Sequence, residues 1–249
     1  MTKKPLKACP ELQIMSYNIH KGFDTRKKDF VLDEIKKSID QVSADIVFLQ
    51  EVVGSSGMGS HESQFEFIAD KVWDHHSYGK NAVSSSGHHG NAILSKFPFI
   101  FTKNVDLSVN RVEKRGMIHA IIKIPECDTE VHLLCTHLNL LERDRKKQVE
   151  IIKKYINEHI PPYCHLIMAG DFNDWRNIVT DDFCKNLGLK ESFTEANGDC
   201  ARTFPSKFPL LRLDRIYFKN LGFIDARRCY GEPWDKLSDH LALLSRFRL

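Results

Sequence analysis

Short apolar runs that border polar residues recur along this chain, and this pattern most constrains how it can fold. The run at 165–169 is followed at once by Asp171 and Asn173, with a glycine at 170 between run and carboxylate. A buried strand holds its backbone fixed, so the residues beyond its end lie at one edge of a sheet, where open α/β sheets hold ligands. Similar runs border these polar residues: Asn18, Glu51, His137 and the pair Asp239-His240. The pattern predicts an α/β protein with a polar site along one sheet edge.

The composition is that of an ordinary globular protein. A length of 249 residues suits one large domain, so we expect a single domain over 1–249 with its core at about 12–249. Hydrophobic residues make up 42% and charged residues 28% of the chain. The net charge of +3 argues against a general polycation that binds nucleic acid, although a local basic edge remains compatible with it.

The cysteines and the apolar segments bear on where the protein works. The seven cysteines include no Cys-x-x-Cys pair, and several lie in apolar runs, which argues against a zinc site or a disulfide framework. Residues 1–7 carry lysines with no apolar run behind them, unlike a signal peptide. No segment approaches the roughly 20 apolar residues of a membrane span. We therefore expect a cytoplasmic protein.

Apolar spacing predicts the secondary structure. Intervals of three and four residues indicate helices at 31–42, 65–72 and 142–158. Residues 54–59 are typical of a flexible loop. Strands are expected at 14–19, 45–49, 92–94, 117–124, 131–135, 166–169, 215–218 and 241–247. Strands outnumber helices and mix hairpin with crossover connections, so we expect two packed sheets with helices on their outer faces.

Asn18 and Glu51 are candidate metal ligands. Each follows an apolar strand, and a carboxylate with a carboxamide oxygen suits Mg²⁺ or Mn²⁺. Asp239 could bind the same metal or polarise a water. The plainer alternative, that Asn18 and Glu51 only end their strands, becomes weaker with so many polar neighbours.

Asp171, Asn173, His240 and Asp214 are candidate catalytic residues. Asp171 and Asn173 are two apart, so on an extended segment both would face the same way and hold a water and a phosphoryl oxygen. An Asx turn is an equally good interpretation of that pair taken alone. The His240 imidazole can stabilise or protonate a phosphoryl oxygen, and Asp214 is the candidate carboxylate that orients it.

A further group of residues is suited to binding phosphate. His137 and Asn139 alternate on one strand face. His119 and His132 are instead expected in the core. Arg115 can donate two hydrogen bonds to one phosphate, whereas a solvated charged turn is the alternative for its neighbours. The remaining candidates stand at strand boundaries: Lys21, His89 and Asn91.

Six segments in order resemble the endonuclease/exonuclease/phosphatase superfamily over residues 14–246. They are Asn18-Ile19-His20, Leu49-Gln50-Glu51, Thr136-His137-Leu138-Asn139, Gly170-Asp171-Phe172-Asn173, Leu213-Asp214-Arg215-Ile216 and Ser238-Asp239-His240. The segments 87–92, 113–116 and 201–215 are similar to a YbhP-like bacterial branch of it. The resemblance implies a DNase I-like, four-layer α/β sandwich and Mg²⁺-dependent phosphoester hydrolysis, with Mn²⁺ as a substitute.

The resemblance also implies roles for single residues. Asn18 and Glu51 would bind the metal with Asp239 near it. Asp171 would activate the attacking water, and Asn173 would hold that water or a phosphoryl oxygen. His240, supported by Asp214, would stabilise the transition state. His137 would bind phosphate or protonate the leaving oxygen.

The expected substrate is a lipid or small-molecule phosphodiester, hydrolysed by a monomer. Members of the branch are often encoded beside a cardiolipin synthase, and the segment 204–211 has apolar residues that could rest on the inner membrane, although a place in the core is slightly favoured for Phe204, Phe208 and Leu211. A nuclease is the alternative, and an adaptor without activity is the least favoured. Basic residues that could line a nucleic-acid groove, or form a solvated face, are Lys27, Lys28, Arg143, Arg145, Lys146 and Lys147.

Overall fold

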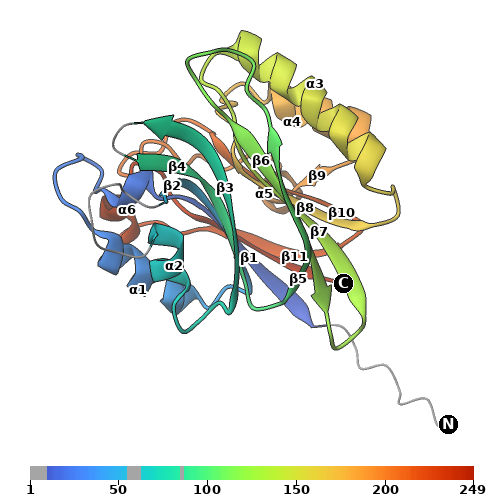
Figure 1. Ribbon diagram of the computed structural model, residues 1–249, viewed down its shortest axis with the longest axis horizontal. Coiled ribbons are helices and arrows are strands. Elements are labelled where there is room, and N and C mark those ends of the chain that lie inside the picture. Colours follow the sequence, from blue (N-terminus) through green and yellow to red (C-terminus); the bar gives the residue numbers. More distant parts are fainter. Residues whose placement is uncertain (1–9, 55–62, 85–86) are drawn as a thin grey trace.

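Two mixed six-stranded sheets form the centre of the molecule, which we describe from a computed structural model (Figure 1). The structure describes residues 10–54, 63–84 and 87–249. One sheet has the order β11-β12-β1-β2-β4-β3 and the other β5-β6-β7-β8-β10-β9. The strands of the first sheet are β1 (Glu11–Asn18), β2 (Ile46–Val53), β3 (His75–Ser84), β4 (Gly87–Ser95), β11 (Gly222–Arg228) and β12 (Leu243–Arg248). Those of the second are β5 (Phe99–Asp106), β6 (Gly116–Ile124), β7 (Thr129–His137), β8 (His165–Asp171), β9 (Lys190–Glu191) and β10 (Asp214–Lys219).

Helices cover the outer faces of both sheets. In Figure 1, α1 and α2 lie outside the first sheet and α3 and α4 outside the second. The helices are η1 (His20–Gly22, a 3-10 turn), α1 (Leu32–Val42), α2 (Gln64–Ala69), α3 (Glu142–His159), α4 (Ile178–Leu187), α5 (Ser192–Asn197) and α6 (Trp234–Leu237). The expected α/β sandwich of four layers, helix on sheet on sheet on helix, is confirmed.

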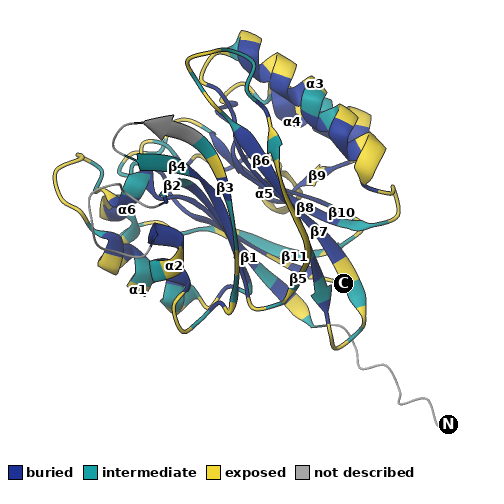
Figure 2. Ribbon diagram, in the orientation of Figure 1, coloured by how far each residue is buried: buried dark blue, intermediate teal, exposed yellow. Residues whose placement is uncertain are grey.

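Alternating side chains of each strand fill two different layers. In β2, Phe48 belongs to the core between the sheets, whereas Val47 and Leu49 pack toward the helices of the first sheet. This is the period of two that a strand buried on both faces requires. The central strands of both sheets are accordingly dark blue in Figure 2, whereas the edge strands β5 and β11 are mainly yellow and teal.

The parallel strand pairs place the polar ends of strands together. β1 and β2 are parallel and joined through α1, with Asn18 opposite Gln50. β7 and β8 are parallel and joined through α3, with His137 opposite Asp171. Antiparallel β10 then places Asp214 opposite Asp171. Because parallel strands end at the same edge, both sheets deliver their polar residues to one rim.

Sequence patterns identified the central elements better than the peripheral ones. The expected strands and helices are all present, although α2 ends at Ala69 and β12 begins at Leu243. β3, β5 and β11 were not predicted, since edge strands expose polar residues that hide the alternation. Helix α4 was also missed despite apolar residues at positions 179, 183 and 187. The loop expected at 54–59 lies, beyond Gly54, outside the described residues.

The state of one cysteine differs from the sequence-based prediction. Cys127 is disulfide-bonded, which sequence spacing did not indicate, because a disulfide needs proximity in space and not along the chain. The free cysteines are Cys135, Cys164, Cys184, Cys200 and Cys229. Of the helices within the described ranges, none has the length and apolar character to cross a membrane.

Candidate active site

Asp171 is the centre of the polar rim. Its side chain is buried at the end of β8, and its Oδ2 accepts a hydrogen bond from Asn18 Nδ2 at 3.1 Å. The same oxygen lies 3.4 Å from His137 Nε2 and 3.7 Å from His240 Nε2. Asp171 Oδ1 accepts from the backbone N–H of Asn173 at 3.0 Å. Three residues from distant parts of the chain, Asn18, His137 and His240, thus meet around the Asp171 carboxylate.

The backbone around Asp171 explains its position. At Gly170 a Cβ would lie 1.9 Å from the carbonyl oxygen of Thr136, so only glycine allows β8 to lie this close to β7. Asn173 has a left-handed φ of 50°, and its Nδ2 donates to the Leu138 carbonyl at 2.9 Å. The Asx turn is therefore present, and the assumption of an extended segment at 171–173 was wrong. Asp171 Oδ2 nevertheless faces the site.

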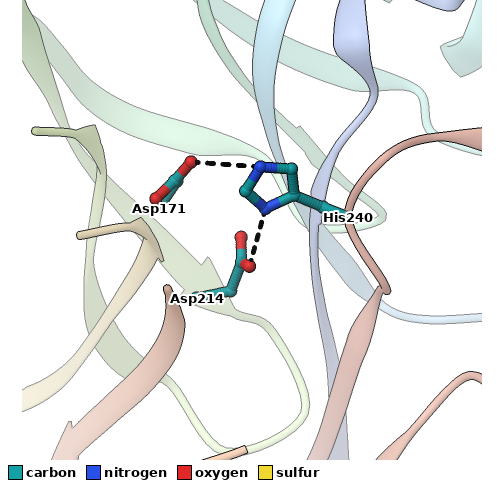
Figure 3. A group of neighbouring side chains, drawn as sticks. All are labelled: Asp171, Asp214 and His240. Atoms are coloured by element: carbon teal, nitrogen blue, oxygen red, sulfur yellow. Dashed lines mark hydrogen bonds and ion pairs between the residues drawn. The ribbon is translucent and has the colours of Figure 1, made fainter. Parts of the chain in front are cut away.

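His240 and Asp214 form a buried ion pair beside Asp171 (Figure 3). His240 Nδ1 lies 2.9 Å from Asp214 Oδ2. Burial alone would lower the His240 pKa, but the carboxylates of Asp214 and Asp171 outweigh it and raise the pKa to about 10. The imidazole is therefore a cation at neutral pH. Burial and the Asp214 charge raise the pKa of Asp171, and the His240 cation opposes that rise.

His137 has the opposite charge state. Burial holds its pKa well below the ordinary value, and the cations Arg115 and His240 lower it further. The rim therefore has one charged and one neutral imidazole on the two sides of Asp171. Environments that separate the pKa values of similar groups are typical of acid–base sites.

Asn18 lies at the same rim, and the loop that carries Asp239 is hydrogen-bonded to it. The bond from Asn18 Nδ2 to Asp171 turns its Oδ1 away, where it accepts the His20 N–H at 3.1 Å. Ser238 Oγ donates to the Asn18 carbonyl at 2.7 Å and ties the loop of Asp239 to β1. Glu51 follows Gln50, which is paired with Asn18 across β1 and β2. It lies at an irregularity in the register of β2 with β4 between Leu49 and Val52 and has a left-handed φ of 55°.

Two oxygen-rich groups could therefore hold a cation. Asp171, Asp214 and His240 have ligand atoms within 4.8 Å of one another. His240 is protonated in that group, and a protonated imidazole cannot bind a metal. Asn18, Glu51 and Asp239 instead offer a carboxamide and two half-buried carboxylates, a hard-oxygen set that fits a divalent ion.

The predicted phosphate-binding residues differ in their burial, their charged neighbours and their hydrogen bonds. Burial lowers the pKa of His89, and the charges of Lys21 and Arg115 lower it further, so these three lie within electrostatic reach of one another. Asn91 is buried, and its Nδ2 donates to the Gly116 carbonyl at 3.1 Å, which joins the two sheets. Asn139 Oδ1 accepts from Gln148 at 3.2 Å, while its buried Nδ2 has no partner among the described residues.

Burial distinguishes between the alternatives for three residues, which are His119, His132 and Arg145. His119 and His132 are core residues, as expected, and hydrogen-bond to each other at 2.9 Å. The interpretation of Arg145 as part of a solvated face or groove was wrong, since its residue is only 3% exposed. Arg145 Nη1 donates to the Asn139 carbonyl at 3.1 Å, and the guanidinium lies 4.8 Å from the ring centre of Trp175.

Two residues near the rim were not assigned roles from the sequence. Buried His20 places its Nε2 3.7 Å from Asp239 Oδ2. Fully buried Arg215 donates to the carbonyls of Asp214 and Asp174 at 2.9 and 3.0 Å, so it fixes the backbone that presents Asp214. Both lie inside the motif segments quoted above, and that position was the available signal.

The fold and the rim define a class of phosphoester hydrolases. The chain belongs to the endonuclease/exonuclease/phosphatase family, whose family model matches residues 15–240 and whose members act on phosphoesters. The family that the sequence motifs suggested is therefore confirmed.

Particular relatives extend this result. The chain is 41% identical to the uncharacterized protein YbhP of Escherichia coli K12, over 95% of this chain and 96% of YbhP. Its fold is similar to that of an endonuclease/exonuclease/phosphatase from Beutenbergia cavernae (TM-score 0.82, 19% identity, 96% of this chain and 72% of that one). It is also similar to D. rerio TDP2 complexed with single strand DNA product (TM-score 0.71, 17% identity, 96% and 99% covered). The two structural likenesses concern the fold.

Proposed function

We propose that this protein is a divalent-metal-dependent phosphodiesterase, in which a water attacks phosphorus in line. The observation that carries the proposal is the surroundings of Asp171. A buried carboxylate with a raised pKa stands between a cationic and a neutral imidazole, next to an oxygen set that suits Mg²⁺.

In this mechanism Asn18, Glu51 and Asp239 would hold the Mg²⁺ or Mn²⁺. When bound there, the ion neutralises charge that develops on the phosphoryl oxygens. Asn18 is suited to this role because its amide is already oriented by Asp171 at 3.1 Å. This preorganisation reduces the rearrangement that binding requires.

The remaining residues of the site transfer protons, orient the water or stabilise charge. Asp171 accepts a proton from the attacking water, as its raised pKa allows, and Asn173 orients that water through its free amide oxygen. The His240 cation, held by Asp214 at 2.9 Å, stabilises the negative charge of the transition state. Neutral His137 suits a phosphate ligand better than an acid, since its low pKa disfavours the protonated form.

We further propose that the substrate is a lipid or small-molecule phosphodiester. The segment 204–211 borders the site, because the Phe204 ring lies 5.1 Å from the His240 ring and Ser206 N donates to the Asp239 carbonyl at 2.8 Å. Phe208, Leu210 and Leu211 in this segment are 77%, 65% and 39% exposed, so a core position was wrong for Phe208 and for Leu211. Exposed apolar residues beside Arg202, Lys207 and Arg212 suit contact with an anionic membrane surface.

A nuclease is the second candidate function. Lys21 and Arg115 place positive charge near His89, and D. rerio TDP2, which shares this fold, was crystallised with a single strand DNA product. Binding to duplex DNA that weakens steeply with salt would support the nuclease, whereas weak binding that hardly depends on salt would support the smaller substrate.

A substrate screen with a Glu51→Gln variant tests the proposal. Nitrophenyl esters, lipids and oligonucleotides would be assayed with Mg²⁺ and with Mn²⁺. Outer-sphere partners of metals contribute about 10–100-fold, so loss of a direct ligand should lower kcat/KM by at least about 100-fold. Exposed Glu34→Gln on α1 is the charge-matched control, and a melting curve verifies folding. Full activity of Glu51→Gln at ordinary metal concentration would refute the metal assignment.

A further inference from the structure

A polar cavity lies at the edge formed by β3, β5 and the loop before β6. It has a volume of about 480 Å³, and the residues that matter in its lining are Lys80, Asn81, Asn104, Asp106, Lys114 and Arg115. Arg115 links this cavity to the site. It precedes Gly116, whose carbonyl accepts hydrogen bonds from Asn91 Nδ2 at 3.1 Å and from Thr136 Oγ1, next to His137, at 3.5 Å. Its charge also lowers the pKa values of His137 and His89.

The cavity has an excess of positive charge. The cations Lys80, Lys114 and Arg115 outnumber two carboxylates: Asp106 in the lining, and Glu113, which forms an ion pair with Arg115 at 3.4 Å. Asp106 already accepts the Ser108 N–H at 2.8 Å, and that hydrogen bonding and the Lys114 charge hold its pKa below the ordinary value. Arg115 Nε is buried and has no hydrogen-bond partner in the described part of the chain. The Arg115 guanidinium therefore uses Nη2 for Glu113, at 3.4 Å, and keeps an unused donor at Nε.

The walls of the cavity are held in place. Ser108 Oγ accepts the Arg115 N–H at 3.2 Å, and Asn104 Nδ2 donates to the Lys80 carbonyl at 3.1 Å. A Cβ at Gly116 would lie 2.3 Å from Asn81 Oδ1, so the absent side chain leaves the space that these amides occupy. A polar floor with fixed cations around it is typical of a site for an oxyanion.

We propose that this cavity binds a second phosphate group of the substrate, with Arg115 between it and the scissile phosphodiester. This inference rests on the proposed function and narrows its substrate to phosphodiesters that carry a further phosphate. Lys80 and Lys114 would contact that group and give specificity, whereas the residues around Asp171 would act on the scissile bond.

Hydrolysis of a matched substrate pair tests the site. Thymidine 5′-(p-nitrophenyl phosphate) would be compared with its 3′-phosphorylated form, using wild type and a Lys80→Ala/Lys114→Ala variant. We expect wild type to prefer the 3′-phosphorylated diester about tenfold in kcat/KM, as a charge-assisted contact allows. The variant should lose this preference and retain its activity on the other diester. Lys37→Ala, an exposed lysine on α1, is the control. Equal losses on both substrates would overturn the proposal.

Equilibrium binding separates this inference from the proposed function. Thymidine 3′,5′-bisphosphate should bind wild type about tenfold more tightly than thymidine 5′-monophosphate, and the double variant should bind both alike. Equal affinities in wild type would refute the second site even if hydrolysis occurs. A difference in affinity without hydrolysis of any diester would keep the site and refute the proposed function.

A second pair of ligands identifies the source of the phosphate. Phosphatidylinositol 4-phosphate and phosphatidylinositol in mixed micelles differ only in the added group. Selective hydrolysis of the 4-phosphate by wild type, lost in the double variant, would support a lipid substrate. Selectivity confined to the nucleotide pair would keep the second site but assign it to a nucleotide or strand.

Discussion

At the scale of single residues, neighbouring carboxylates decide the chemistry of the site. His137 and His240 lie within 3.7 Å of the same Asp171 oxygen, and both are buried. Asp214 at 2.9 Å makes the difference between them, since it raises the His240 pKa to about 10 while the His137 pKa stays low. Asp214, with Asp171 beside it, thus keeps His240 a cation that can stabilise a phosphoryl transition state.

Replacing Asp214 with Asn should therefore lower the His240 pKa. Without this carboxylate, burial dominates, and the pKa should fall from about 10 towards or below the ordinary value of 6.5. The His240 imidazole resonances, followed by NMR against pH, would report the change, together with a loss of activity of about 100-fold or more. Asp225→Asn, which removes a surface carboxylate beside Arg246, is the control. An unchanged His240 titration would contradict the pairing.

At the scale of elements, the close approach of β7 and β8 positions the carboxylate. Thr136 and Gly170 are paired across these strands, and His137 and Asp171 follow in the same register. This parallel pair was predictable from its apolar runs. Edge strands such as β5 were not, because neighbouring strands, and not their own alternation, hold them in the sheet.

Gly170→Ala should separate the two strands and destabilise the protein. The added Cβ would lie 1.9 Å from the Thr136 carbonyl oxygen at a φ of +152°, so a loss of about 3 kcal/mol or more in the free energy of unfolding is expected. Gly198→Ala is the matched control: its φ is +77°, but nothing lies within 4 Å, so only about 1 kcal/mol should be lost. Similar unfolding midpoints for both variants would show that the contact does not matter.

At the scale of the whole molecule, histidines that are buried in the uncharged form make the free energy of unfolding depend on pH. His119 lies between β6 and α3, hydrogen-bonded at 2.9 Å to both Tyr155 and His132. Burial, together with the charge of His132, lowers its pKa to about 4. Between about pH 4 and pH 6.5 the unfolded chain therefore binds a proton that the folded chain does not.

Stability should accordingly fall as the pH drops through this window. His119 contributes a slope of up to about 1.4 kcal/mol per pH unit, and its contribution is retained above pH 6.5. In His119→Phe the decrease between pH 7 and pH 5 should be smaller than in wild type, measured by urea unfolding at each pH. Identical slopes in the two proteins would mean that His119 titrates alike in both states.

The sequence by itself determined the strands that carry the polar residues, the family and most of the candidate site. These follow from local patterns: apolar runs that end in Asn18, Glu51 and Asp171, and motifs in a set order. Local patterns also identified the pairing of His240 with Asp214, which lie 26 residues apart.

The tertiary structure alone decided the charges and the remaining partners. Protonated His240, neutral His137, buried Arg145 and exposed Phe208 depend on burial and on neighbours from distant segments. The physical reason is that desolvation and Coulomb interactions act through space, so they cannot be predicted from a residue's position in the chain. The second cavity at Lys80 and Lys114 exists for the same reason, since its walls come from strands that only folding brings together.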